Sequence, residues 1–282
     1  MRSQMLMTSF MSCSMSQMPT EKRSRMKRIS FMRSTFSCGF MPAAGSSSRS
    51  SRGFVAVAPN PRGSEGFGQG FHDLQIADNG GGEFRDVMNV LPFLDSLGYV
   101  DMNRKATWGG SGGGYLSLVI ATEAPEAFEA QVLRAPVSSW KHLAIDRFGA
   151  SGRAWAAKRT PARERGEFGG SYEEIPEEYE LRSPVNFAEN AAVPQLLFHG
   201  LRDSAVSPRQ SELWVNRMRG LGKGELVHYV EYPDEDHGLN RYKATIRDRI
   251  EKMTYFFSEN LDLPELMVER ADRLGEKPDE MV

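Results

Sequence analysis

Residues 108–114 read Trp-Gly-Gly-Ser-Gly-Gly-Gly and place Ser111 inside a Gly-x-Ser-x-Gly frame. A short strand-like run, Lys105–Trp108, precedes this stretch, and an apolar run that can form a helix, Tyr115–Ala121, follows it. A serine exposed on a tight strand-to-helix turn needs small neighbours, so the stretch predicts a nucleophile elbow. The N–H of Gly112 would then lie at a helix N-terminus, where negative charge is stabilised. The alternatives are a plain glycine-rich turn or a phosphate-cradling loop, but the Walker pattern needs a Lys after its last Gly, which is missing here.

Composition narrows the classes of protein. The chain has 282 residues and a formal net charge of −2, so nothing in it indicates a nucleic acid or an anionic membrane as a partner. No apolar run approaches the roughly 18 to 20 residues that a membrane-spanning helix needs. The two cysteines, Cys13 and Cys38, both lie near the N-terminus, so we expect no disulfide framework, no metal site and no cofactor.

Residues 1–52 differ from the rest of the chain. They carry nine of the 15 Met, nine Lys or Arg, many Ser and a single acid, Glu21. This composition indicates a disordered low-complexity tail, sequence foreign to the mature protein, or an organelle transit segment. No secretory apolar region and no Asn-x-Ser/Thr sequon is visible, so we expect a cytoplasmic protein, with the transit segment as the alternative.

From residue 53 to 262, strand-like and helix-like runs alternate, and a charged tail, residues 263–282, follows. The predicted strands are Phe54–Ala58, which reads as buried and parallel, Lys105–Trp108, Gln131–Ala135, Gln195–Phe198 and Leu226–Tyr232. Helical spacing of apolar residues predicts one helix through Phe84, Val87, Met88, Leu91 and Leu94, and a final helix through Ile246, Ile250, Met253 and Phe257. Another helix is predicted from Ser207 as N-cap, with Pro208 in its first turn and Gln210 as a capping residue. Residues 137–192 read as a helical excursion or lid.

This alternation predicts an α/β fold, a mostly parallel sheet with helices on both faces and a site at the carboxyl ends of its strands. A serine hydroxyl needs a base, and the base needs an orienting group. Among five histidines, only His237 opens the loop between the last strand and the last helix, and Asp203 is the one carboxylate at the end of the preceding strand. The alternatives are a solvated loop histidine and a surface turn or capping aspartate. A metal site built from Glu235, Asp236 and His237 is disfavoured because neighbouring side chains on a loop point apart.

Several further segments carry a resemblance to a known family. They are Arg52-Gly53-Phe54, Pro59-Asn60-Pro61-Arg62-Gly63-Ser64-Glu65-Gly66-Phe67-Gly68, Gly109-Gly110-Ser111, Gly113-Gly114-Tyr115, Arg182-Ser183-Pro184, His199-Gly200, Asp203 and His237-Gly238. Over about residues 52–260 the chain resembles the catalytic domain of the prolyl oligopeptidase family of serine peptidases, nearest to its acylaminoacyl-peptidase and dipeptidyl-peptidase branches. The resemblance implies an α/β-hydrolase fold, with Ser111 as nucleophile, Asp203 as orienting acid and His237 as general base.

The chain also departs from this family. Gly112 stands where the family usually has an aromatic residue, and Ser204–Val206 offer little to bind a substrate backbone. Relatives have a strand and a loop just upstream of the Arg-Gly-Phe segment that supply a second oxyanion donor. Residues Phe40–Arg49 cannot form that loop, and Cys38-Gly39-Phe40 is the only candidate for a turn of this kind. We therefore expect Gly112 to be the one oxyanion donor and turnover below that of intact relatives. Either a short piece of residues 26–41, around Ile29–Met32 or Thr35–Phe40, replaces the strand, or Phe54–Ala58 packs loosely.

The function predicted from the resemblance is serine-type hydrolysis of short peptides through an acyl-enzyme, with a peptide substrate as partner. A carboxylesterase remains an alternative because a Ser-Asp-His triad also cleaves esters. A catalytically impaired protein of the same fold is the other alternative.

Overall fold

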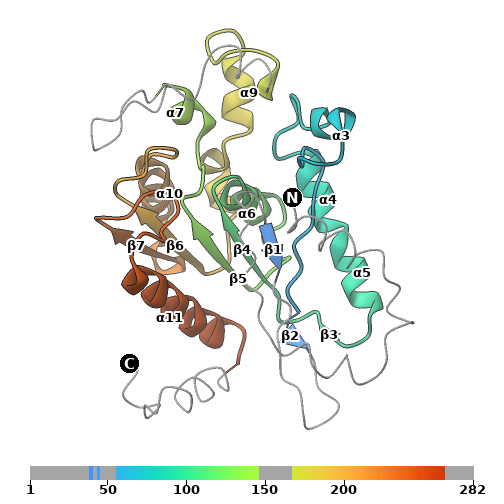
Figure 1. The fold of residues 1–282 in the computed structure, drawn as a ribbon, viewed down its shortest axis with the longest axis vertical. Coiled ribbons are helices and arrows are strands. Elements are labelled where there is room, and N and C mark those ends of the chain that lie inside the picture. The colour runs from blue at the N-terminus through green and yellow to red at the C-terminus, as the bar shows by residue number, and fades with distance from the viewer. Residues whose placement is uncertain (1–37, 41–42, 45–54, 146–166, 264–282) are drawn as a thin grey trace.

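The computed structural model describes residues 38–40, 43–44, 55–145 and 167–263. Its main sheet has five strands in the order β1-β4-β5-β6-β7 (Figure 1). These strands are β1 (Cys38–Phe40), β4 (Ala106–Gly110), β5 (Ala130–Arg134), β6 (Gln195–Gly200) and β7 (Val227–Tyr232). The strands from β4 to β7 are parallel, and β1 pairs with β4 in the antiparallel direction. A separate small sheet pairs β2 (Ala43–Ala44) with β3 (Val100–Asp101).

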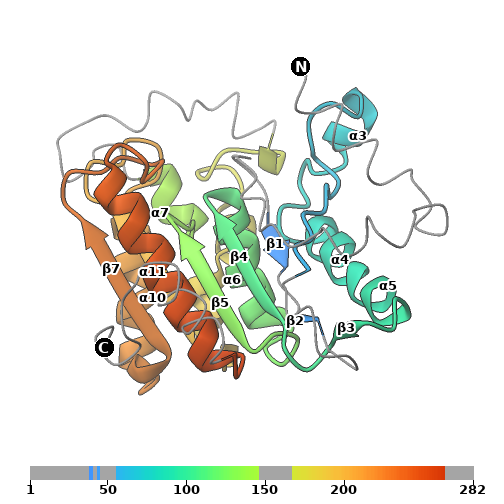
Figure 2. The same ribbon diagram turned by 60° about the horizontal axis from the view of Figure 1, so that its bottom comes forward.

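Helices cover both faces of this sheet. On one face, α6 (Gly112–Glu123) and α10 (Arg209–Gly220) form a buried cluster that contains Leu118 and Trp214 and includes Leu133 of β5. On the other face, α11 (Lys243–Asn260) packs Phe257 against Val132, and Figure 2 shows this helix in front of the sheet, running along the strands. Neighbouring residues of a strand point to opposite faces, which is why Val132 and Leu133 enter different clusters. The predicted α/β fold is confirmed.

The apolar pattern through residues 84–94 predicted one helix, but the structure has two. They are α4 (Gly82–Met88) and α5 (Val90–Ser96), and the short helix α3 (Gln69–Asp73) precedes them. Pro92 explains the break, because it has no N–H to donate to the carbonyl of Met88 and its ring crowds that carbonyl. The spacing of apolar residues therefore predicted the buried face correctly, but the prediction of one continuous helix is wrong.

The prediction of a buried parallel strand at Phe54–Ala58 is wrong for the residues that the structure describes. Of residues 55–58, only Val57 has a β-bridge, Ala56 is exposed, and the others are half-buried. Position 54 lies outside the described residues. A buried strand needs a ladder along its length, and β1, the strand beside β4, is only three residues long. Val57 packs instead against the edge of an aromatic core cluster.

Residues Cys38–Phe40, inside the predicted Thr35–Phe40 segment, do pair with β4. The pairs are Cys38 with Gly109, Gly39 with Trp108, and Phe40 with Thr107. The other candidate, Ile29–Met32, lies outside the described residues, as do residues 146–166 of the excursion. In the described part of the excursion lie α7 (Trp140–Ile145), α9 (Pro176–Leu181) and the 3₁₀ helix η3 (Pro184–Asn190).

The start of α10 differs from the prediction by one residue. Pro208, rather than Ser207, occupies the capping position, although the Ser207 hydroxyl accepts the N–H of Arg209 at 3.2 Å. Gln210 does not cap the helix. It is fully buried, and its Oε1 accepts the N–H groups of Ser138 and Ser139 at 2.9 and 2.8 Å, which fastens the segment after β5 to α10. A short 3₁₀ turn, η4 (Gly224–Leu226), then leads into β7. Among the described residues, none of the helices combines the length and apolar character needed to cross a membrane.

Candidate active site

Ser111 stands on a strained turn between β4 and α6. Its backbone has φ 57° and ψ −119°, a conformation that a residue with a side chain adopts only when its surroundings enforce it. Here the strand and the helix approach each other closely, because a Cβ placed on Gly109 would lie 2.2 Å from the carbonyl oxygen of Gly113. The flanking glycines of the Gly-x-Ser-x-Gly frame are thus required by the turn, and the predicted elbow geometry is present.

The turn is held by backbone hydrogen bonds on both sides. The N–H of Ser111 donates to the carbonyl of Arg134 at 2.8 Å, and the carbonyl of Ser111 accepts the N–H of Tyr115 at 2.9 Å. Gly112 is the first residue of α6, so its N–H precedes the intrahelical ladder. A group at this place can donate to an anion that forms beside Ser111, which is the role expected of Gly112.

Asp203 and His237 meet at the carboxyl ends of β6 and β7. The Nδ1 of His237 lies 2.6 Å from the Oδ2 of Asp203, although the two residues belong to different loops. Asp203 is fully buried, whereas about a quarter of the His237 side chain is exposed. The ionised carboxylate can only accept, so Nδ1 carries the proton and Nε2 keeps its lone pair. The ring is therefore in the tautomer that a general base needs.

The Asp203 carboxylate is surrounded by donors. Its Oδ1 accepts the N–H groups of Ala205 and Val206 at 2.7 and 2.9 Å. Burial acts to raise the pKa of this carboxyl, but the hydrogen bonds from His199 and His237 outweigh it and hold the pKa well below its usual value. Asp203 thus stays ionised although water does not reach it.

His199 is a residue of this site whose role the sequence did not reveal. It lies in β6 and is fully buried, and its Nε2 is 3.1 Å from the carbonyl of Val206 and 3.3 Å from the Oδ2 of Asp203. Since a carbonyl only accepts, Nε2 carries the proton, and Nδ1 accepts from the Ser211 hydroxyl 2.7 Å away. His199 therefore gives Asp203 a second imidazole donor. The signals in the sequence are its spacing of four residues from Asp203 and the place of His199-Gly200 among the segments that resemble the family.

The loops that carry Asp203 and His237 are packed against each other. A Cβ on Gly200 would lie 2.5 Å from the carbonyl oxygen of Glu235, and the same carbonyl accepts the N–H of Arg202 at 2.9 Å. The carboxylate of Glu235 accepts the N–H groups of Arg241 and Tyr242, each at 3.0 Å, which ties this loop to the start of α11. Glu235 thus has a structural use. In the described parts of the chain, His, Cys, Asp and Glu side chains form no group of three that could hold a metal ion.

Ser111, Asp203 and His237 follow β4, β6 and β7. All three therefore lie at the carboxyl-terminal ends of the parallel strands. Asp203 and His237 are in direct contact, and a contact between Ser111 and His237 stays a prediction. A nucleophile at an elbow, an oriented imidazole and a helix N–H are together the groups that acyl transfer requires.

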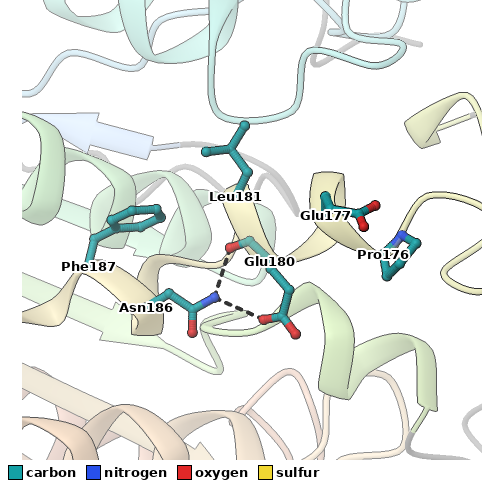
Figure 3. A pocket seen from close by; sticks show the side chains of 6 residues that line it. All are labelled: Pro176, Glu177, Glu180, Leu181, Asn186 and Phe187. Carbon is teal, nitrogen blue, oxygen red and sulfur yellow. Dashed lines mark hydrogen bonds between the residues drawn. The ribbon is translucent and has the colours of Figure 1, made fainter.

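A groove lies between α9 and η3 (Figure 3). It is lined by Pro176, Glu177, Glu180, Leu181, Asn186 and Phe187. The Nδ2 of Asn186 donates to the carbonyl and to the carboxylate of Glu180, and that carboxylate also pairs with Lys141 at 2.6 Å. Asn186 and Glu180 thus have partners, and the groove contains none of the predicted site residues.

Comparison with known proteins gives one family. The sequence model of the prolyl oligopeptidase family matches residues 42–263. The chain is 28% identical over 209 residues to the uncharacterized peptidase YuxL of Bacillus subtilis, covering 73% of this chain and 30% of that protein. It is 30% identical over 198 residues to dipeptidyl peptidase family member 6 of Caenorhabditis elegans, covering 67% and 25% of the two chains.

Solved structures agree with this family. The fold is similar to that of a puromycin-hydrolyzing peptidase of Mycobacterium tuberculosis, with a TM-score of 0.64 and 25% identity. The similarity covers 74% of this chain and 29% of that one. The chain thus spans less than a third of the length of these relatives.

Proposed function

Because the chain belongs to the prolyl oligopeptidase family, we propose that it is a serine peptidase that hydrolyses short peptides with Ser111, Asp203 and His237. The observation that carries the proposal is the 2.6 Å hydrogen bond between Asp203 and His237 at the sheet edge where the Ser111 elbow also lies. The names of the relatives, a dipeptidyl peptidase and a puromycin-hydrolyzing peptidase, support a substrate with an amide bond near a chain end.

In this mechanism, Nε2 of His237 takes the proton of the Ser111 hydroxyl as Oγ attacks the scissile carbonyl. Asp203 holds the ring in the required tautomer and stabilises the imidazolium that forms. The N–H of Gly112 donates to the oxyanion of the tetrahedral intermediate. His237 then gives its proton to the leaving amine, and an acyl-enzyme remains on Ser111. Water, activated by the same imidazole, releases the acid product.

The test is covalent labelling of the purified chain with a fluorophosphonate probe. We expect the wild type to be labelled and Ser111→Ala to lose labelling and turnover while keeping its circular dichroism spectrum and melting temperature. Ser204→Ala, which changes a serine beside Asp203, is the matched control and should be labelled like the wild type. Labelling that survives in Ser111→Ala, or a wild type that is never labelled, would contradict the proposal.

A comparison of substrates then separates the peptidase from an esterase. Peptide anilides and nitrophenyl esters should be assayed side by side on the wild type and on Ser111→Ala. Turnover of peptide anilides that disappears with Ser111 supports the peptidase. Turnover of the esters alone would assign the site to an esterase.

A further inference from the structure

Arg134 occupies a central place at the carboxyl edge of the sheet. It is the last residue of β5, which lies between the strand that leads to Ser111 and the strand that leads to Asp203. Its backbone carbonyl accepts the N–H of Ser111 at 2.8 Å. The Nη1 of its guanidinium donates to the carbonyl of His237 at 2.5 Å. One residue therefore contacts both the nucleophile turn and the histidine loop.

The guanidinium fits into a space that Gly110 leaves open. A Cβ at Gly110 would lie 2.4 Å from Nη2 and 2.7 Å from Nε of Arg134. The residue directly before Ser111 thus accommodates the side chain that reaches His237. This fit fixes the direction of the guanidinium independently of its hydrogen bond.

The charge of Arg134 is costly where it stands. Burial lowers the pKa of its guanidinium, and the Asp203 carboxylate acts in the opposite direction. Arg249 of α11 adds to the cost, since its own pKa is lowered by burial and by the nearby charge of Arg134. A buried cation that donates to a carbonyl and faces a second cation contributes little to stability. Its position between the two loops suggests another role.

We propose that Arg134 is a positioning residue that keeps the His237 loop at a fixed position relative to the Ser111 turn. This inference rests on the proposed function, because it concerns the distance between the nucleophile and the base. Asp203 holds the ring of His237 at Nδ1, and this bond does not by itself set the position of the His237 backbone relative to the Ser111 turn. The hydrogen bond from Arg134 to the His237 carbonyl is a second point of attachment, anchored on the strand that also holds the N–H of Ser111.

The experiment compares Arg134→Met, Arg134→Lys and a control. Arg134→Met should lower the fluorophosphonate labelling rate and kcat/KM about ten- to a hundredfold, mainly through kcat, because small displacements of a catalytic group cost up to about 10²-fold. KM should change little. Arg134→Lys keeps a donor at this place and should restore part of the rate. The matched control is Arg182→Met, since Arg182 also donates to backbone carbonyls, those of Asn79 and Ala77 at 3.1 and 2.6 Å. It should lower the melting temperature without lowering kcat.

A double-mutant cycle tests the fit at Gly110. Gly110→Ala should slow labelling severalfold in the wild type, because its methyl group displaces the guanidinium. The same change should cost much less in an Arg134→Ala background.

The outcomes separate the two proposals. A wild-type labelling rate and a wild-type kcat in Arg134→Met, or additive effects in the cycle, would overturn the role of Arg134 and leave the triad standing. A wild type that is not labelled, or a Ser111→Ala protein that is, would instead overturn the proposed function.

Discussion

The two edges of the main sheet are built very differently. At one edge, six residues of β6 pair in parallel register with six residues of β7, and the loops that follow these strands bring Asp203 and His237 together. At the other edge, β4 meets only the three residues of β1, in the antiparallel direction. Residues 55–58, which follow in the chain, have one bridge at Val57. The strand that leads to the nucleophile turn therefore has five pairs with β5 and only three with β1, whereas β6 and β7, which lead to the acid and the base, pair along their whole length.

The two regions should therefore respond differently to substitution. Asp203 accepts four hydrogen-bond contacts, and the loops that carry Asp203 and His237 are held by backbone hydrogen bonds, so a change at Asp203 should lower the catalytic rate. At the other end of the strand order, residues 55–58 are half-buried or exposed, so changes there should be small. The following predictions test that contrast.

The largest effect should come from Asp203→Asn. The amide of Asn would donate to Nδ1 of His237 and force the proton onto Nε2, which then cannot accept the proton of Ser111. The loss in kcat should be about 10⁴-fold, the magnitude known for the same change in trypsin-like triads. Steady-state kinetics of the purified variant measure it, with Asp234→Asn, an exposed acid of the histidine loop, as the control. A loss below about tenfold would show that Asp203 does not orient the base.

Much of the site could be predicted from the sequence because its residues are placed by chain order. The elbow needs glycines at fixed spacing, and parallel strands bring the residues that follow them to one edge. His237 and Asp203 could therefore be chosen by position alone. The strand from Gln195 was found in the same way, since a short apolar run bounded by turns is typical of a buried parallel strand.

What could not be predicted depends on partners distant in sequence. His199 reads as an ordinary strand histidine until Asp203 and Ser211 fold around it. Gln210 matches a capping pattern, but it is buried against the segment after β5 and serves its backbone instead. Pro92 is a different case, since its effect on the helix was readable in the sequence but was masked by the regular spacing of the apolar residues around it.

The second prediction compares the same substitution in the two regions. Val132→Ala removes a side chain that is 1% exposed in β5, and Val57→Ala removes a half-buried one beside the β1 edge. Val132→Ala should lower the free energy of unfolding by about 2 kcal/mol, and Val57→Ala by less than about 0.7 kcal/mol, in proportion to the apolar surface that each buries. Urea unfolding followed by tryptophan fluorescence measures both. Equal losses would show that residues 55–58 are as firmly packed as the central strands.

The smallest effect should come from His199→Leu. This change removes the second imidazole donor to Asp203 and leaves the 2.6 Å bond to His237 in place. A hydrogen bond to a charged group contributes roughly 1.5 to 3 kcal/mol, but this donor is shared with the Val206 carbonyl, so we expect a loss near the lower end, about tenfold in kcat. KM should not change, because His199 is buried behind Asp203 and does not face the substrate.

The matched control for this prediction is His228→Gln, at an exposed position of β7 paired with Leu196 of β6. It should leave kcat unchanged. Ser211→Ala offers a milder form of the same test, since without its hydroxyl the ring of His199 is free to change tautomer. If His199→Leu lowers the melting temperature and leaves kcat unchanged, then His199 only fills the core, and Asp203 is oriented by its two backbone N–H groups and His237 alone.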